Sequence, residues 1–470
     1  VEGYLLLPRA WTQNLPAIDT DWANFWQSQR SFTDRREQFA EFLTSLKSKS
    51  ERPGLHFFHS MLPHTPSSFL PSGKGYGRDN IIVGMGQKKA WGQNQSLIDH
   101  AHQRHLLQVG YVDRLLGELI ARLKELKIYD ECLLVITADH GISFRAGLPY
   151  RAVTHETRSD ILRIPLFIKL PNQKQGKVSD ENVQHVDILP TIADALEVEI
   201  PWSTEGRSAL QGAMPKEKHV LVDGKSHRFG ATLDGDWGVL SDQIQKFGVG
   251  EWSRLFGNSP LLGRRIDKLK LIPSQVQCRI DSPEMFRQLR PVSTFVPARI
   301  QGTLPNAKSR NVRLAIAVNG TIRAVTESRG SILWAAMVPE ESFQAGDNRV
   351  EVLQIHEGET FSRLCETGEG ESVTYRLRGD ELVDSRGRTY EIRRKAHVGY
   401  LDIFHADRSC VTFSGWSADV KRKRLPKRIV MLADGEHFHV GSLSGNSEDV
   451  VPDLGDERFK WCGFNFCFPR

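Results

Sequence analysis

The sequence predicts an α/β domain with a mostly parallel sheet flanked by helices, followed by small all-β domains. Two observations carry this prediction. In the first half, the continuous apolar runs CLLVITAD (132–139) and IPLFIKL (164–170) alternate with helical patterns. Such runs are typical of parallel strands that are covered on both faces. From about residue 291 the pattern changes to short strands that are joined by hairpin signals.

The helical patterns of the first half differ in length. Apolar residues recur at spacings of three and four between about Thr33 and Lys49. A longer pattern starts at Ser96, which with Asp99 forms an S-x-x-D capping motif, and runs to Leu126. The pattern of residues 186–196 predicts a short helix. The aromatic run LHFFHSML (55–62) predicts another strand, which ends at the Pro-His-Thr-Pro turn.

In the second half, RLAIAV and TIRAVT flank Asn319-Gly320, and RIVMLA and EHFHV flank Asp434-Gly435. Both dipeptides favour the tight turn of a β-hairpin. We therefore divide the chain into an α/β domain, a connecting region, a first β domain and a C-terminal β domain, with the bounds 1–215, 216–290, 291–368 and 372–470.

Composition excludes several classes of protein. The 470 residues carry a net charge of +5, which gives no reason to expect nucleic acid as a partner. No run of 18 apolar residues occurs, so no segment present here is predicted to span a membrane. The six cysteines form no C-x-x-C pair, so the sequence does not support a zinc finger or a thioredoxin-like protein. We expect Cys132 to pack as a small hydrophobe, and the sequence leaves open whether Cys462 and Cys467 pair.

The sharpest chemical feature is Asp139-His140-Gly141, which follows an apolar strand. A carboxylate oxygen and an imidazole nitrogen are ligands for a divalent cation, and the glycine allows a tight turn. Where the strand ends, the two side chains are free to converge on one ion. The alternative is an Asp-capped turn followed by a core histidine.

Several further residues are candidates for contact with a substrate or metal. His64, between two prolines, is suited to hydrogen-bond an oxyanion or to protonate a leaving group. His155 and Arg145 lie in the loop after the Asp-His-Gly turn and suit a sulfate or phosphate ester. The alternatives are an exposed turn histidine and a solvated loop. We expect His185 and Asp187 to open and cap the last helix, and a second metal position there is the alternative.

Four segments in order resemble the sulfatase branch of the alkaline-phosphatase superfamily: LPHTP (62–66), LLVITADHG (133–141), ILRIPLFIKLP (161–171) and HVDILPTIADAL (185–196). The resemblance implies a divalent cation and a covalent nucleophile that attacks sulfur or phosphorus. Asp139 and His140 match the later pair of metal ligands, and His64 matches the histidine that contacts the ester. Calcium would suit a sulfatase, and zinc or manganese would suit a phosphoester enzyme.

The chain also departs from the family pattern. It has no C-x-P-x-R or S-x-P-x-R motif, and the first metal-binding carboxylate of the family belongs before the residues present here. We therefore expect the chain to lack the N-terminal part of the fold, including the nucleophile and a membrane anchor. The resemblance to membrane-anchored bacterial sulfatase-like proteins implies the periplasmic or extracellular face of the cell envelope.

The predicted function is metal-dependent hydrolysis or transfer of sulfate or phosphate esters of a surface glycan or lipid. The alternative is a non-catalytic, sulfatase-like protein that binds glycans at the cell surface. A third possibility is a two-metal site that recruits His155 or His185. We expect the 470-residue chain alone to turn over aryl esters poorly, and we expect residues 291–470 to fold without metal.

Overall fold

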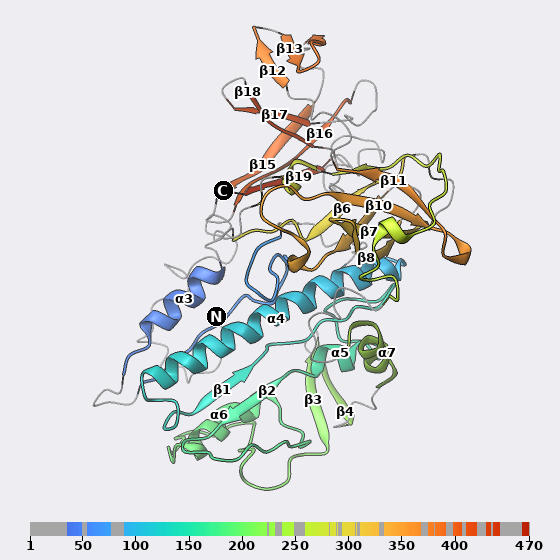
Figure 1. The fold of residues 1–470 in the computed structure, drawn as a ribbon. Coiled ribbons are helices and arrows are strands. Elements are labelled where there is room, and N and C mark those ends of the chain that lie inside the picture. The colour runs from blue at the N-terminus through green and yellow to red at the C-terminus, as the bar shows by residue number, and fades with distance from the viewer. Residues whose placement is uncertain are drawn as a thin grey trace.

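The computed structural model describes most of the chain. A 31-residue helix, α4 (Gln95–Glu125), crosses the middle of the molecule (Figure 1). The described residues are 35–48, 54–76, 89–222, 225–230, 237–248, 259–281, 283–287, 289, 294–305, 307, 311–328, 333–367, 375–379, 381–391, 398–406, 410–420, 429–433, 436–441 and 463–469. Asn94 caps α4, because its side chain accepts a hydrogen bond from the Leu97 amide. The expected cap at Ser96 is therefore wrong, since Ser96 already lies inside the helix.

One side of α4 forms the core of the α/β part. Its buried tyrosine and leucines recur every four residues from Tyr111 to Leu123. Helix α3 (Arg35–Ser45) packs here through Phe39, and the rings of Phe42 and Phe58 stack at a centroid distance of 4.7 Å. The helix predicted from about Thr33 is thereby confirmed within the described residues.

The strand predicted at residues 55–62 is wrong. Residues 54–61 are irregular, and no described strand pairs with them. Phe58 and Leu62 pack on the α3–α4 core, while the side chains of Leu55 and Phe57 are 91% and 83% exposed. An aromatic run has the side-chain alternation of a strand, but a strand needs a partner for its backbone groups.

The next two predicted strands are confirmed, but their relative direction is not as expected. β1 (Leu134–Thr137) pairs with β2 (Leu166–Lys169) in antiparallel register, so the described α/β residues do not form a mostly parallel sheet. A continuous apolar run indicates burial and does not encode the direction of the neighbouring strand. Helices α5 (Arg158–Leu162), α6 (His185–Ala195) and α7 (Trp237–Phe247) and the hairpin β3–β4 (Glu217–Val222, Lys225–Gly230) complete this part.

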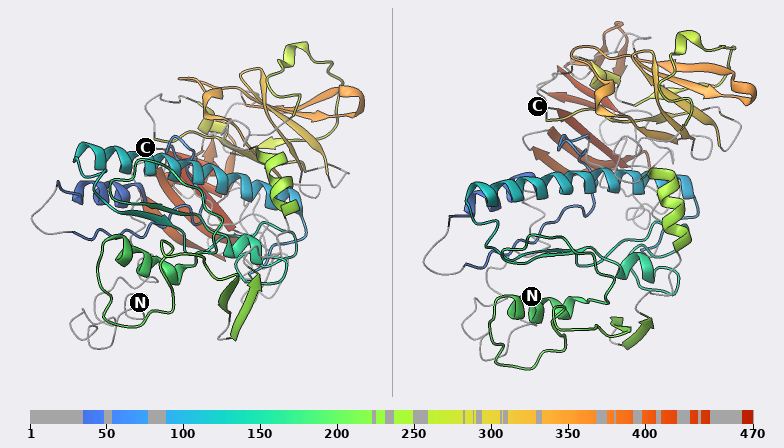
Figure 2. Two further views of the ribbon diagram at one scale, coloured as in Figure 1. Left: turned by 90° about the horizontal axis from the view of Figure 1, so that it is seen from below. Right: turned by 60° about the horizontal axis from the view of Figure 1, so that its bottom comes forward.

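Two antiparallel sheets lie on the other side of α4 (Figure 2). The order of one sheet is β11-β10-β7-β8 and that of the other is β5-β6-β9. Val318 pairs with Thr321 across Asn319-Gly320, which confirms the predicted hairpin. The strand bounds are Arg279–Ile280, Arg299–Thr303, Arg313–Val318, Thr321–Glu327, Leu333–Met337, Val350–Ile355 and Phe361–Glu366 for β5 to β11.

The two sheets enclose an apolar core that includes Ile300, Leu314 and Trp334. A disulfide joins Cys278 and Cys365, whose Cα atoms lie 5.4 Å apart, at this core. Short 3-10 helices occur at Ile266–Lys268, Pro283–Phe286, Glu340–Ser342 and Glu357–Glu359.

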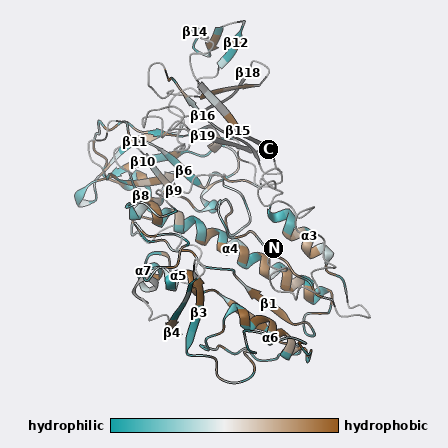
Figure 3. Cartoon of the chain, turned by 180° about the vertical axis from the view of Figure 1, so that it is seen from behind, coloured by the Kyte–Doolittle hydropathy of each residue, from teal (hydrophilic) through white to brown (hydrophobic). Residues whose placement is uncertain are grey.

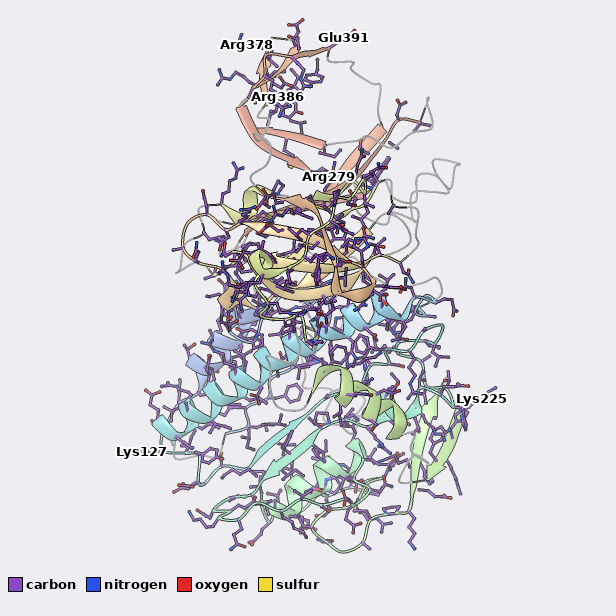
Figure 4. All side chains as sticks on the ribbon, turned by 45° about the vertical axis from the view of Figure 1, so that its right-hand side comes forward. Lys127, Lys225, Arg279, Arg378, Arg386 and Glu391 are labelled. Atoms are coloured by element: carbon purple, nitrogen blue, oxygen red, sulfur yellow. A yellow bond between two sulfur atoms is a disulfide. The ribbon has the colours of Figure 1, made fainter. Side chains whose placement is uncertain are left out.

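Two further sheets form the C-terminal region, which lies uppermost in Figure 4. Their orders are β14-β13-β12-β18-β17 and β15-β16-β19. Ala433 pairs with Glu436, which confirms the second predicted hairpin, although Asp434-Gly435 and Cys462 lie outside the described residues. The strand bounds are Tyr375–Arg378, Glu381–Asp384, Thr389–Glu391, Val398–Ala406, Cys410–Ala418, Ile429–Ala433, Glu436–Gly441 and Gly463–Pro469 for β12 to β19.

The first β-sheets are fixed to the α/β part. Leu70 and Leu107 share an apolar cluster with Val296 and Met337. Glu340 accepts a hydrogen bond from Ser72 and pairs with Lys74 at 3.3 Å. Figure 3 shows hydrophobic residues along much of α6 and β3. No helix among the described residues has the length and apolarity that a membrane crossing requires.

Candidate active site

The Asp139-His140 pair lies in the turn that follows β1. The side chains converge, with 3.4 Å between Asp139 Oδ2 and His140 Nε2. Asp139 Oδ1 also accepts a hydrogen bond from the His140 backbone amide at 2.9 Å. The Asp139 side chain is 64% exposed and the His140 side chain 26% exposed, so the pair faces a surface that a ligand can reach.

Hydrogen bonding indicates which nitrogen of His140 is free. Nδ1 lies 2.7 Å from the Gly141 carbonyl oxygen, which can only accept a hydrogen bond. Nδ1 of the neutral ring therefore carries the hydrogen, and Nε2 keeps its lone pair on the side of Asp139. A backbone carbonyl behind the ring is a common way to orient a metal-binding histidine.

Gly141 fixes this turn against helix α5. Its amide donates to the Ile161 carbonyl at 2.8 Å. A Cβ atom at this position would lie 1.9 Å from the carbonyl oxygen of Asp160. Only glycine allows two backbone segments to approach so closely, which explains the third residue of the motif.

The side chain of Asp160 holds the loop that follows. It accepts hydrogen bonds from Arg145 Nε at 2.8 Å, Arg145 Nη2 at 3.0 Å and Ser143 Oγ at 2.8 Å. The side chains of Arg145 and Asp160 are each 15% exposed. The structure thus places Arg145 near the turn, with its guanidinium engaged by a carboxylate in fork geometry.

His155 is exposed and lies further along the same loop. Within the described part of the chain it makes no hydrogen bond to Asp139 or His140. The neighbouring Glu156 accepts a hydrogen bond from the Thr154 hydroxyl at 2.8 Å, and this bond lowers the pKa of the Glu156 carboxyl. The structure therefore does not bring His155 into direct contact with the predicted metal ligands.

His64 lies in the Pro-His-Thr-Pro turn, where its amide donates to the Met61 carbonyl at 2.9 Å. Its imidazole is exposed, and Nδ1 lies 2.8 Å from the Thr65 carbonyl oxygen. Because a carbonyl only accepts, Nδ1 of the neutral ring carries the hydrogen and Nε2 is left for other partners. The carbonyl oxygen of His64 accepts from the side chains of Arg35 and Gln108.

Helix α4 links this turn to the loop after Asp-His-Gly. The ring of His105 interacts with the Pro63 backbone and lies 5.5 Å from the ring of Phe144, measured between centroids. The ring of His102 stacks on the ring of Phe144 as well, with a centroid distance of 4.2 Å. Burial lowers the pKa of His105 to about 4 and that of His102 to about 3. Both the His64 turn and residue 144 therefore rest on one stretch of α4.

His185, the first residue of α6, also approaches the turn. Its Nε2 lies 2.8 Å from the carbonyl oxygen of Ala138, directly before Asp139. The cap of α6 comes from Gln184 and Asp187: Asp187 accepts from the Gln184 amide at 2.7 Å and from the Arg207 amide at 2.9 Å. The predicted capping role therefore holds for Asp187, while His185 contacts the strand end.

Asp139 and His140 fit the donor set of a divalent cation, with one oxygen and one free nitrogen on the same side. Among the described residues, however, no group of three or more His, Cys, Asp or Glu side chains is arranged to hold a metal ion. Sequence reasoning missed Gln108, His105 and Asp160. The signal for the first two was present, since they are polar residues on the buried side of a long helix.

Part of the chain is similar to known proteins. Residues 10–198 match the model of the sulfatase family. An arylsulfatase of Clostridium perfringens is 29% identical over 143 residues, which are 28% of this chain and 27% of that enzyme. An extracellular sulfatase SULF-1 homolog of Drosophila melanogaster is 30% identical over 109 residues, which are 23% of this chain and 10% of that protein.

A solved structure of the phosphonate monoester hydrolase SpPMH from Silicibacter pomeroyi shares 22% identity over 32% of this chain and 41% of that chain, with a TM-score of 0.26. The chain therefore matches less than a third of either curated relative, at 27% and 10% of their lengths. Residues 10–198 of this chain belong to the sulfatase branch of the alkaline-phosphatase superfamily.

Proposed function

We propose that the complete protein is a metal-dependent hydrolase or transferase of sulfate or phosphate esters. The observation that carries this proposal is the convergence of Asp139 Oδ2 and His140 Nε2 to 3.4 Å at the end of β1. The family of residues 10–198 supports sulfate or phosphate ester chemistry at the level of the superfamily. A divalent cation bound here would stabilise the negative charge that develops on the ester oxygen.

Each candidate residue has a role in this proposal. Asp139 and His140 would hold the cation. His64, whose Nδ1 is turned to the Thr65 carbonyl, presents Nε2 to the ester group and, when protonated, donates a proton to the leaving oxygen. His155 is exposed in the loop after the Asp-His-Gly turn, and we assign it a contact with the substrate. Arg145 would have to leave Asp160 to reach a substrate, so we assign it to positioning the loop.

The substrate and location belong to the proposal as well. The substrate class is a sulfated or phosphorylated glycan or lipid on the outer side of the cell envelope. The name of the Drosophila relative places that protein outside the cell, which supports an extracellular or periplasmic site for this one. We propose sulfate and phosphate esters jointly, because a divalent cation held by Asp139 and His140 suits the oxyanion of either class.

Metal binding tests the proposal directly. Calorimetric titration of the metal-free protein with Ca²⁺, Mn²⁺ and Zn²⁺ should show binding of at least one ion, and Asp139→Asn and His140→Gln should each weaken it about 10-fold or more. Asp130→Asn is the matched control, because Asp130 is an exposed carboxylate near the other end of β1. Turnover of an aryl sulfate and an aryl phosphate by the complete protein should fall in the same two variants. Equal metal affinity in all variants would exclude this site.

A further inference from the structure

A group of buried polar side chains on α4 grips the backbone of the His64 turn. Arg104 is 4% exposed and Gln108 is fully buried, and the two lie four residues apart on one side of the helix. Arg104 Nη2 donates to the Ser67 carbonyl at 2.8 Å. Its Nε donates to the hydroxyl of Tyr76 at 3.2 Å, and that hydroxyl donates to the same Ser67 carbonyl.

Gln108 makes the closest contacts with the turn. Its Nε2 donates to the carbonyl oxygens of Pro63 and His64, both at 3.0 Å. Its Oε1 accepts from the amide of Ser68 at 2.9 Å. The Gln108 side chain thus donates two hydrogen bonds to residues 63–68 and accepts one from them. Since residues 63–68 belong to no strand or helix, these bonds take the place of regular secondary structure.

The arrangement is costly if its role is packing alone. A buried amide must find partners for each of its polar atoms, whereas an apolar side chain of the same volume packs without that demand. Gln108 fixes the carbonyl of the residue whose imidazole stays exposed. The direction of the His64 ring follows from its backbone, because Nδ1 is tied to the next carbonyl at 2.8 Å.

We propose that Gln108 is a positioning residue for His64. By its hydrogen bonds to the carbonyls of Pro63 and His64, the Gln108 side chain sets the direction of the His64 imidazole. This inference rests on the proposed function for its catalytic meaning. The structural part, that Gln108 determines where the His64 ring points, stands independently of the reaction.

The test uses the full chain with Gln108→Met, which keeps the length of the side chain and removes all three hydrogen bonds. Histidines are labelled with ¹³C at Cε1, and the His64 signal is identified by its loss in His64→Gln. We expect the His64 signal to shift or broaden in Gln108→Met. The control is Glu118→Gln, an exchange at a 45% exposed site of the same helix, which should leave the signal unchanged.

In the complete protein, Gln108→Met should lower kcat about 10-fold to 100-fold with little change in KM, because a misplaced group costs rate rather than binding. An unmoved His64 signal would overturn the inference, whatever happens to kcat. If the signal moves but no form of the protein hydrolyses either ester, the proposed function fails and the positioning role stands. Should Gln108→Met not fold, Gln108→Asn replaces it, because the shorter amide cannot reach all three partners.

Discussion

A Cβ atom on Gly141 would lie 1.9 Å from the carbonyl oxygen of Asp160, which is far inside van der Waals contact. The atom it would strike belongs to the backbone of a segment that also accepts the Gly141 amide through Ile161. The position of the Asp-His turn relative to α5 therefore depends on the absence of a side chain at residue 141.

Gly141→Ala should destabilise the α/β part by about 3 kcal/mol, because the backbone must shift to relieve the overlap. The loss is measured as a lower free energy of unfolding in urea. Gly117→Ala is the matched control, since nothing lies within 4 Å of a Cβ at that position in α4. This control should stabilise the helix by up to about 1 kcal/mol. Equal effects of the two substitutions would contradict the close approach.

The Arg145–Asp160 pair gives a second prediction. Each partner is 15% exposed, so removing one leaves a largely buried charge without compensation. We expect Arg145→Met and Asp160→Asn each to lower stability by about 2–3 kcal/mol, and the double variant to lose less than the sum of both.

An exposed ion pair provides the control for this prediction. Glu125→Gln removes the carboxylate that pairs with Arg122 at a site where this carboxylate is 69% exposed, and it should lower the free energy of unfolding by less than about 1 kcal/mol. The measurement is again urea unfolding. Strict additivity of the Arg145 and Asp160 losses would show that the two side chains do not act as a pair, and it would favour a direct substrate role for Arg145.

The sequence predicts local features of this protein better than long-range ones. Asn319-Gly320 specifies its hairpin through residues that tolerate a positive φ, observed at 51° and 77°. The apolar runs at β1 and β2 likewise predict strands. Their antiparallel pairing and the irregular course of residues 54–61 depend on partners distant in the chain, which an apolar pattern does not encode.

The candidate site shows the same division. Asp139, His140 and Gly141 are adjacent in sequence, so their turn could be recognised from the residues alone. The contact of Gly141 with Asp160 and the hydrogen bond of Gln108 to His64 join positions 19 and 44 residues apart. The helical pattern marks Gln108 as a polar residue on the buried side, but it does not show which distant segment that side chain contacts. The Cys278–Cys365 disulfide, with a separation of 87, was missed for the same reason.

The buried histidine His102 predicts a dependence of stability on pH. Burial, reinforced by His105 and Lys246, lowers its pKa from 6.5 to about 3. Below pH 6.5 the His102 imidazole binds a proton in the unfolded chain, whereas in the folded protein it stays neutral until about pH 3. Stability is therefore lost as the pH falls through this range. The contribution of this one group approaches about 1.4 kcal/mol per pH unit.

His102→Phe removes the titrating group and keeps a ring to stack on Phe144, which lies 4.2 Å from the imidazole centroid. Between pH 6 and pH 4 the variant should lose less stability than the wild type, by about 1 kcal/mol or more per unit. Unfolding in urea at several pH values gives the comparison. Parallel curves for wild type and variant would mean that His102 is not held neutral by the fold.

The Cys278–Cys365 disulfide closes a long loop across the β-sheets that contain β5 and β11. A cross-link over a separation of 87 residues restricts the unfolded chain strongly, and its removal should cost about 2–5 kcal/mol. The double substitution Cys278→Ala/Cys365→Ala should therefore speed hydrogen exchange in β6, β7 and β10, which share the core beside the disulfide.

Cys132→Ala provides the control, because Cys132 is a free and half-buried cysteine next to β1. Exchange in β6, β7 and β10 should keep its wild-type rate in this control and should accelerate when reductant is added. In the double variant, reductant should have no further effect on these strands. If reductant accelerates their exchange equally in the double variant, the protection comes from another source than the Cys278–Cys365 bond.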